Sequence, residues 1–126
     1  SPSVTNSPYD NGVKQFNDVN ANNGSHYNNT TGVFTCPVAG FYFFTGSLWS
    51  GNSDANNGNN YALIKRLDSN GNNEVQIAGC NHHDDYGQLV MSVGYYCAKG
   101  DKIFLWYNGS IRGSTPRNYF SGCLLG

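Results

Sequence analysis

Short runs of β-branched and aromatic residues alternate with clusters of Asn, Gly and Ser along the whole chain. No segment keeps an apolar period of 3.6 residues, and the alternation of apolar and polar positions instead has the period of two that is typical of strands. The pattern predicts an all-β chain, and the regular spacing favours a two-sheet sandwich or a barrel. We expect strands near residues 12–19, 32–36, 40–50, 60–68, 73–80, 87–98, 102–108 and 118–125.

Two glycine-containing turns predict hairpins. Asn70-Gly71 lies between the strands 60–68 and 73–80 and predicts a type I′ turn, which needs a positive φ at both central residues. Gly100 supplies the same conformational freedom for the next hairpin. Both turns are therefore expected to join antiparallel neighbours.

Alternation also assigns faces to the later strands. The strand 102–108 is apolar on both faces, with Phe104 and Trp106 opposite the core-facing set. We expect these two residues to be buried under a neighbouring loop or protomer, and the alternative is that they form a ligand platform. In the strand 87–98 the residues expected to face the core are Leu89, Met91, Val93, Tyr95 and Cys97.

Length and charge limit the class of protein. A chain of 126 residues is long enough for one domain with a sizeable core, so we expect a single domain over residues 1–126. Only 12% of residues are charged and the formal net charge is -1, which argues against nucleic acid as a partner. The sequence contains no apolar run that could span a membrane, and its first residues do not look like a signal peptide. We expect a mature, soluble domain without membrane insertion.

The sequence contains no motif of a known catalytic site. The nucleophile elbow, the phosphate-binding glycine loops and the His-Glu-x-x-His zinc motif are all missing, so no enzyme is predicted. The four cysteines form no Cys-x-x-Cys pair, which disfavours structural zinc. Cysteines in an Asn-rich chain suit a secreted, extracellular protein, where four glycosylation sequons would also matter: those at Asn23, Asn28, Asn29 and Asn108.

The stretch 32–45 carries a more specific pattern. A strand that ends in Phe-Thr-Cys-Pro is followed by Gly40, Tyr42 and Phe44 at alternating positions. This stretch resembles the signature of the C1q globular-head domain, and the C-terminal residues 119–125 resemble the closing strand of that family. The chain is most similar in kind to the secreted C1q-domain lectins of invertebrates, and no collagen-like stalk is present in it.

The resemblance implies a two-sheet jelly-roll sandwich of the C1q and tumour-necrosis-factor type that assembles as a compact homotrimer. The strand 40–50 has aromatic residues on both faces, so both must be covered. Tyr42 and Phe44 are expected in the core of the protomer, and Phe41 and Phe43 near the threefold interface.

The family topology also places the cysteines. It puts Cys36 near both Cys97 and Cys123, and of these pairings we predict a Cys36–Cys97 disulfide; the alternative is that all four cysteines are buried thiols. Cys123 stands where the family usually has Phe, which leaves the packing of the closing strand open.

With both termini at one end of the sandwich, as the family has them, the opposite end would gather the loops 50–60, 81–87 and 109–117. These loops offer aromatic faces for sugar rings, polar groups for hydroxyls and arginines for a carboxylate. The alternatives are strand-end packing for the aromatics, solvation for the polar loop, and surface or interprotomer ion pairs for the arginines. The candidate ligand-binding residues are Trp49, Asp54, Tyr61, His82, His83, Asp84, Asp85, Tyr86, Arg112 and Arg117.

The first functional hypothesis is a secreted, trimeric, lectin-like pattern-recognition protein of innate immunity. Its ligands would be glycans or microbial surface molecules, with acidic sugars such as sialic acid suited to the arginines. The alternative is a trimeric signalling or scaffolding protein that binds a receptor through exposed aromatics. No cofactor is predicted, although His and carboxylate groups in the loop 81–87 leave calcium as a candidate ligand.

Overall fold

The computed structural model describes residues 4–6, 14–16, 26–50, 60–82, 87–109, 111 and 118–126. These residues form ten strands and no helix, so the described part contains no segment that could cross a membrane as a helix. The strands are β1 (Val4–Asn6), β2 (Lys14–Phe16), β3 (Tyr27–Asn28), β4 (Val33–Thr35), β5 (Gly40–Ser50), β6 (Asn60–Leu67), β7 (Val75–His82), β8 (Gly87–Cys97), β9 (Lys102–Tyr107) and β10 (Tyr119–Leu124).

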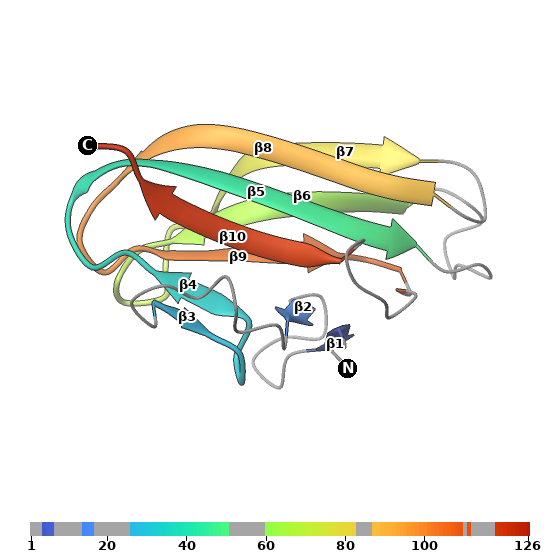
Figure 1. Cartoon of the computed structure of the whole chain (residues 1–126). Coiled ribbons are helices and arrows are strands. Elements are labelled where there is room, and N and C mark those ends of the chain that lie inside the picture. Colours follow the sequence, from blue (N-terminus) through green and yellow to red (C-terminus); the bar gives the residue numbers. More distant parts are fainter. Residues whose placement is uncertain are drawn as a thin grey trace.

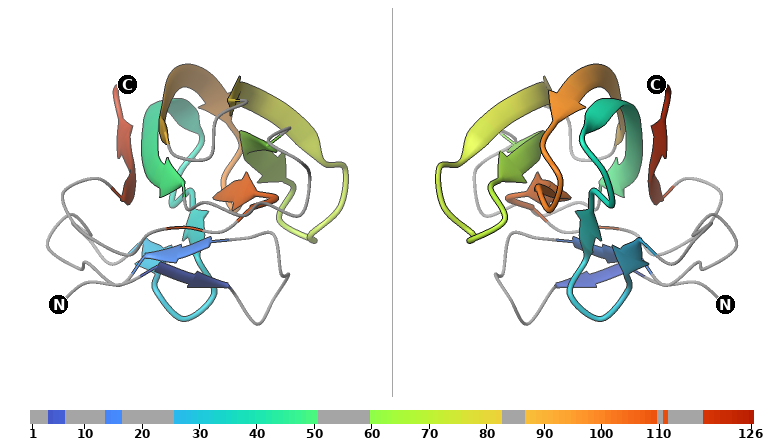
Figure 2. Two further views of the ribbon diagram at one scale, coloured as in Figure 1. Left: turned by 90° about the vertical axis from the view of Figure 1, so that its right-hand side faces the viewer. Right: turned by 90° about the vertical axis from the view of Figure 1, so that its left-hand side faces the viewer.

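The strands form a sandwich of two antiparallel sheets (Figure 1). One sheet has the order β10-β5-β8 and the other has the order β3-β4-β9-β6-β7, while β1 and β2 pair with each other. Seen end-on, the strands surround a central core, with β7 and β8 next to each other (Figure 2). The all-β prediction and the two-sheet jelly-roll expectation are confirmed.

Every expected strand is present, with ends that differ by a few residues. Two further strands, β1 and β3, were not predicted. β5 lies between β8 and β10 and is antiparallel to both, as expected. The C-terminus lies at the end of the sandwich where Leu125 donates its N–H to the carbonyl of Phe41 at 2.7 Å. β1 lies below the sandwich and not at this end (Figure 1), so the expectation that both termini share one end is not met by the described residues.

The core is built from the aromatic residues of the 32–45 stretch. The ring of Phe34 on β4 meets Tyr42 and Phe44 on β5 edge-on, with centroids 6.0 and 5.6 Å apart. Phe44 in turn stacks on Phe120 of β10. Gly122 on the same strand leaves room for Phe44, because a Cβ there would lie 2.7 Å from the Phe44 ring. These rings hold the two sheets together.

The predicted faces of β8 and β9 are confirmed. Leu89, Met91 and Cys97 are buried in the core, and Val93 and Tyr95 pack against it. Phe104 is buried on the opposite side of its sheet with Val33 and Leu67, and Trp106 packs against this second cluster. Burial within the protomer therefore accounts for Phe104, as expected.

The turn between β6 and β7 is not the predicted type I′ turn. Gly71 has a φ of 81°, and the non-glycine residue with a positive φ in the described part is Asn73 rather than Asn70. The Asp68 carboxylate organises a wider turn by accepting bonds from Asn70 N–H, Asn72 N–H and the Asn73 side chain. These bonds lower the pKa of Asp68, chiefly the one from the Asn72 N–H. The turn at Gly100 is present, with a φ of 88°, but it joins β8 of one sheet to β9 of the other, so the predicted hairpin is wrong.

Candidate functional site

The end of the sandwich opposite the C-terminus, here called the far end, gathers the stems of all three candidate loops. The register pairs Ser50 at the end of β5 with Gly87 at the start of β8. It also pairs Asn60 at the start of β6 with His82 at the end of β7. Tyr119 opens β10 opposite Ser47, and Tyr107 closes β9 opposite Ala62. The predicted meeting of the loops 50–60, 81–87 and 109–117 at one end is therefore confirmed for their stems.

Asparagine side chains tie these stems together. The side-chain oxygen of Asn118, just before β10, accepts the N–H of Trp49 at 2.7 Å. The side-chain oxygen of Asn108, just after β9, accepts the N–H of Tyr61 at 3.0 Å. Asn60 is fully buried and donates its amide to the hydroxyl of Tyr107 at 3.3 Å. The three loops therefore extend from strand ends whose backbone positions are fixed by side chains distant in sequence.

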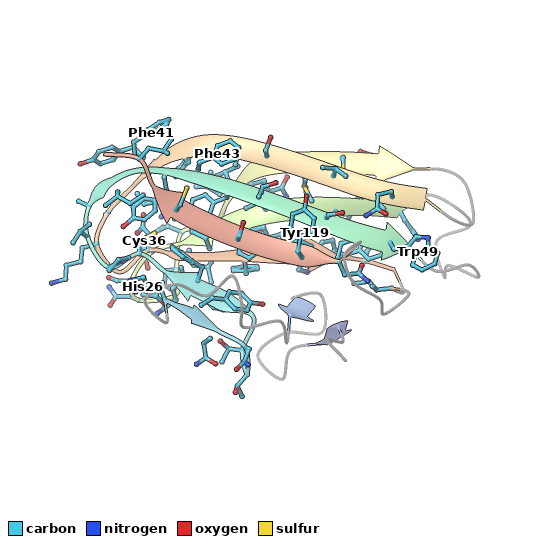
Figure 3. The ribbon with its side chains drawn as sticks, in the orientation of Figure 1. His26, Cys36, Phe41, Phe43, Trp49 and Tyr119 are labelled. Carbon is cyan, nitrogen blue, oxygen red and sulfur yellow. The ribbon has the colours of Figure 1, made fainter. Side chains whose placement is uncertain are left out.

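Two of the predicted ligand-binding residues have described side chains. Trp49 lies at the end of β5 on the three-stranded sheet, at the far end of the sandwich (Figure 3). Tyr61 lies on β6 of the five-stranded sheet, and 37% of its surface is exposed. His82 is the last residue of β7, and its side chain lies outside the described part. The remaining candidates lie outside the described residues: Asp54, His83, Asp84, Asp85, Tyr86, Arg112 and Arg117.

Tyr61 belongs to an aromatic column on the outer face of the five-stranded sheet. Its ring lies 5.4 Å from that of Trp106, and the Lys65 ammonium lies 4.4 Å from the Trp106 ring centroid. Lys65 also pairs with Glu74 at 3.4 Å. The Trp106 ring is therefore flanked by Tyr61 and Lys65, and the Tyr61 ring is more exposed to solvent than the Trp106 ring. The association of Tyr61 with Trp106 was not predicted, because it depends on the pairing of β6 with β9.

The described residues contain no group of three or more His, Cys, Asp or Glu side chains that could hold a metal ion. The Oδ1 atom of Asn60 is buried and has no hydrogen-bond partner, so it is an acceptor that a water or a cation could satisfy. A single amide oxygen does not define a site. Calcium therefore remains a prediction for the loops.

Comparison with known proteins decides the family. The sequence profile of the C1q domain matches residues 3–125, nearly the whole chain. This chain belongs to the C1q domain family. A complement C1q subcomponent of Mus musculus is 32% identical over 127 residues, which is 97% of this chain and 47% of the relative. Its counterpart in Rattus norvegicus is 32% identical over 122 residues, which is 94% of this chain and 45% of that relative. The chain thus spans just under half the length of these relatives.

In this C1q domain, Cys36 and Cys97 meet at the end opposite the loops. Both are buried, and their thiols lie near each other. The Cys36 N–H donates to the carbonyl of Asp101, and the Gly100 N–H donates to the carbonyl of Cys36, so the turn before β9 holds Cys36 in place. All four cysteines are free thiols in the structure. Burial, together with the neighbouring thiol of Cys97, raises the pKa of Cys36 far above its ordinary value. The Cys36–Cys97 disulfide remains a prediction that this arrangement favours.

The outer face of the β10-β5-β8 sheet is an exposed apolar surface. Phe41 lies over Gly94, where a Cβ would come within 2.7 Å of its ring. Cys123 points to this outer side and not into the core, so its departure from the usual Phe of the C1q domain leaves the core intact. We call this surface the aromatic face; its exposed apolar side chains are Phe41, Phe43, Val90, Tyr96 and Tyr119.

Proposed function

We propose that this C1q domain binds glycans through the loops at its far end, as a secreted, lectin-like recognition protein of innate immunity. The observation that carries the proposal is the convergence of the loop stems, which the pairs Asn118–Trp49 and Asn108–Tyr61 hold in register. A framework fixed in this way lets loops of variable sequence present a ligand site without disturbing the sandwich.

The residues of these loops have the chemistry that an acidic glycan requires. Tyr61 offers a partly exposed ring for the apolar face of a sugar. Arg112 and Arg117 carry guanidinium groups that can bind a carboxylate with two parallel hydrogen bonds. Asp54, Asp84 and Asp85 supply acceptors for hydroxyl groups. Sialic acid combines a carboxylate with several hydroxyls and is therefore the ligand we propose.

We further propose that the domain is a homotrimer whose protomers meet through the aromatic face. Phe41 and Phe43 are 44% and 39% exposed, and Tyr96 is 66% exposed, which is unusual for large aromatics on one side of a sheet. Burial between protomers would remove this surface from water. Three glycan sites on one particle would also raise weak single-site binding through multivalency.

The column of Tyr61 and Trp106 on the five-stranded sheet favours a second candidate function. In this alternative the trimer is a signalling or scaffolding protein, and exposed aromatics bind a receptor protein. Tyr and Trp side chains are the usual energetic anchors of such contacts. The two hypotheses differ in where the ligand binds, because the column at Trp106 lies on the five-stranded sheet rather than in the loops.

A glycan array with and without EDTA tests the proposal. We expect the protein to bind sialylated glycans on the array, and we expect this binding to fall after Arg112→Ala and Arg117→Ala. A loss of binding in EDTA would indicate that calcium is part of the site. If the wild-type protein binds no glycan on the array, but binds a receptor protein tightly and loses that binding on Trp106→Ala, the signalling function is supported and the lectin function is rejected.

A further inference from the structure

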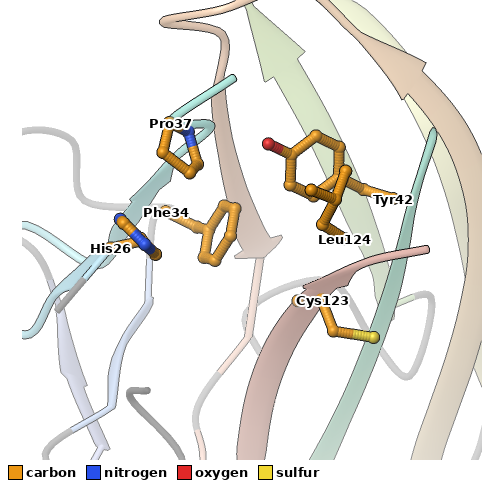
Figure 4. Close-up of a pocket in the computed structure, with 7 residues that line it drawn as sticks. His26, Phe34, Pro37, Tyr42, Cys123 and Leu124 are labelled. Atoms are coloured by element: carbon orange, nitrogen blue, oxygen red, sulfur yellow. The ribbon is translucent and has the colours of Figure 1, made fainter. Parts of the chain in front are cut away.

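A second candidate site lies at the other end of the sandwich. A half-open pocket of about 270 Å³ separates the edge strand β3 and the turn after β4 from the C-terminal strand β10 (Figure 4). Its lining combines side chains of both sheets with the backbone of β10: His26, Phe34, Pro37, Tyr42, Gly122, Cys123 and Leu124.

The walls of this pocket are aromatic and apolar. Phe34 and Tyr42 meet edge-on with centroids 6.0 Å apart, so the pocket is lined by ring edges and faces that suit another ring. The Tyr42 hydroxyl is already engaged, since it donates to the Val38 carbonyl at 2.7 Å. Cys123 contributes its backbone, because Gly122 and Leu124 face inward and the alternation of the strand turns the Cys123 thiol outward.

His26 supplies the polar group of the pocket. Its ring meets Phe34 edge-on at 6.3 Å, on the side of the pocket away from Tyr42 and Leu124 (Figure 4). Its carbonyl accepts the N–H of Thr35 at 2.9 Å, which fixes the backbone that carries the imidazole. A ligand in the pocket can therefore place an apolar ring against Phe34 and Tyr42 and a hydrogen-bond acceptor at His26.

Size and polarity narrow the ligand class. An apolar cavity of about 150 Å³ is enough to bind benzene, so this pocket has room for one substituted ring. A sugar fits this pocket poorly, because its hydroxyls would lose water without finding enough side-chain partners among these walls. We propose that the pocket binds a monocyclic aromatic carboxylate, with the ring packed against Phe34 and Tyr42 and the carboxylate at the His26 imidazole. This site is separate from the glycan loops and does not depend on them.

Fluorine NMR with 4-fluorobenzoate as the probe tests the inference on the intact chain. We expect a saturable shift of the probe signal, and competition by unlabelled benzoate. Leu124 is half-exposed and lines the pocket, so Leu124→Trp should fill the pocket and abolish this shift. Leu125 lies next to it but outside the pocket, so Leu125→Trp should leave the shift unchanged. His26→Phe keeps the ring contact with Phe34 but removes the donor, so benzoate affinity should fall about tenfold while that of benzyl alcohol is retained.

Either of two results would overturn the proposal. The first is no saturable shift with the wild-type chain; the second is a shift that survives Leu124→Trp, which would put the probe elsewhere. If His26→Phe lowers the affinities for benzoate and for benzyl alcohol equally, the proposed contact between the carboxylate and His26 is wrong. Because the glycan proposal is tested at Arg112 and Arg117, failure of one leaves the other standing.

Discussion

The side-chain oxygen of Asn118 accepts the backbone N–H of Trp49 at 2.7 Å and so ties the start of β10 to the end of β5. Asn118 is almost completely buried. Asn118→Ala would leave the Trp49 N–H without this acceptor, so we expect a loss of about 1–3 kcal/mol in the free energy of unfolding. Urea denaturation followed by fluorescence measures it.

The same substitution should also weaken glycan binding, because it loosens the stems of two loops. Asn72→Ala, at an exposed position in the turn after β6, is the matched control and should change neither property. If Asn118→Ala unfolds at the wild-type urea concentration, the tie does not hold the far end together.

Oxidation should join Cys36 to Cys97. Both thiols are buried side by side, and a disulfide there would stabilise the domain by about 2–4 kcal/mol, largely through the unfolded chain. After secretion into an oxidising medium, denaturation and alkylation without reductant should label Cys80 and Cys123 alone. Alkylation of all four cysteines would show that the pair stays reduced, and a peptide linking Cys36 to Cys123 would show the wrong partner.

The Asp68 turn should make stability depend on pH. Its carboxylate has a lowered pKa in the folded chain because it accepts bonds from Asn72 N–H, the Asn73 amide and Asn70 N–H. This stabilisation is present in full above the ordinary Asp pKa of about 4 and is lost as the pH falls through the lowered value. Asp68→Asn should therefore be less stable than wild type at pH 7, and the difference should shrink at a pH well below the ordinary Asp pKa.

Thermal unfolding at both pH values measures this effect. Asn70→Ala is the control, because Asn70 contributes its backbone N–H and the substitution retains it. A difference between wild type and Asp68→Asn that persists unchanged at low pH would assign the effect to something other than the carboxylate charge.

The aromatic face should hold the protomers together. Phe43→Asp places a charge on this face at a position 39% exposed in the protomer, so the fold should survive while the trimer dissociates. Light scattering after size-exclusion chromatography should give a trimer for wild type and a monomer for the variant. Gln76→Asp, exposed on the other sheet, should remain trimeric. A monodisperse wild-type monomer would refute the proposed assembly.

Much of the fold could be predicted from the sequence because alternation with a period of two is a local property. The faces of β8 and β9 followed from it directly. β1 and β3, of three and two residues, were not predicted. The turn type at Asn70-Gly71 was wrong because the Asp68 carboxylate competes for the same backbone groups.

The site was less accessible to prediction. The position of the candidate loops at the far end was predicted from the strand topology, and that topology came from the resemblance to the C1q domain family. The ties at Asn118, Asn108 and Asn60 join residues 69, 47 and 47 positions apart, and nothing local in the sequence distinguishes these asparagines from the many others in the chain. The column of Tyr61 and Trp106 likewise depends on strand pairing.

Titration with sialyllactose and with lactose, followed by calorimetry, tests the central claim most directly. The two sugars differ by the acidic residue that Arg112 and Arg117 are proposed to bind. We predict saturable binding of sialyllactose that is about tenfold tighter than that of lactose, and loss of this preference in the Arg112→Ala, Arg117→Ala double variant. Equal affinities for the two sugars, or an undiminished preference in the folded double variant, would contradict recognition of acidic glycans by the far-end loops.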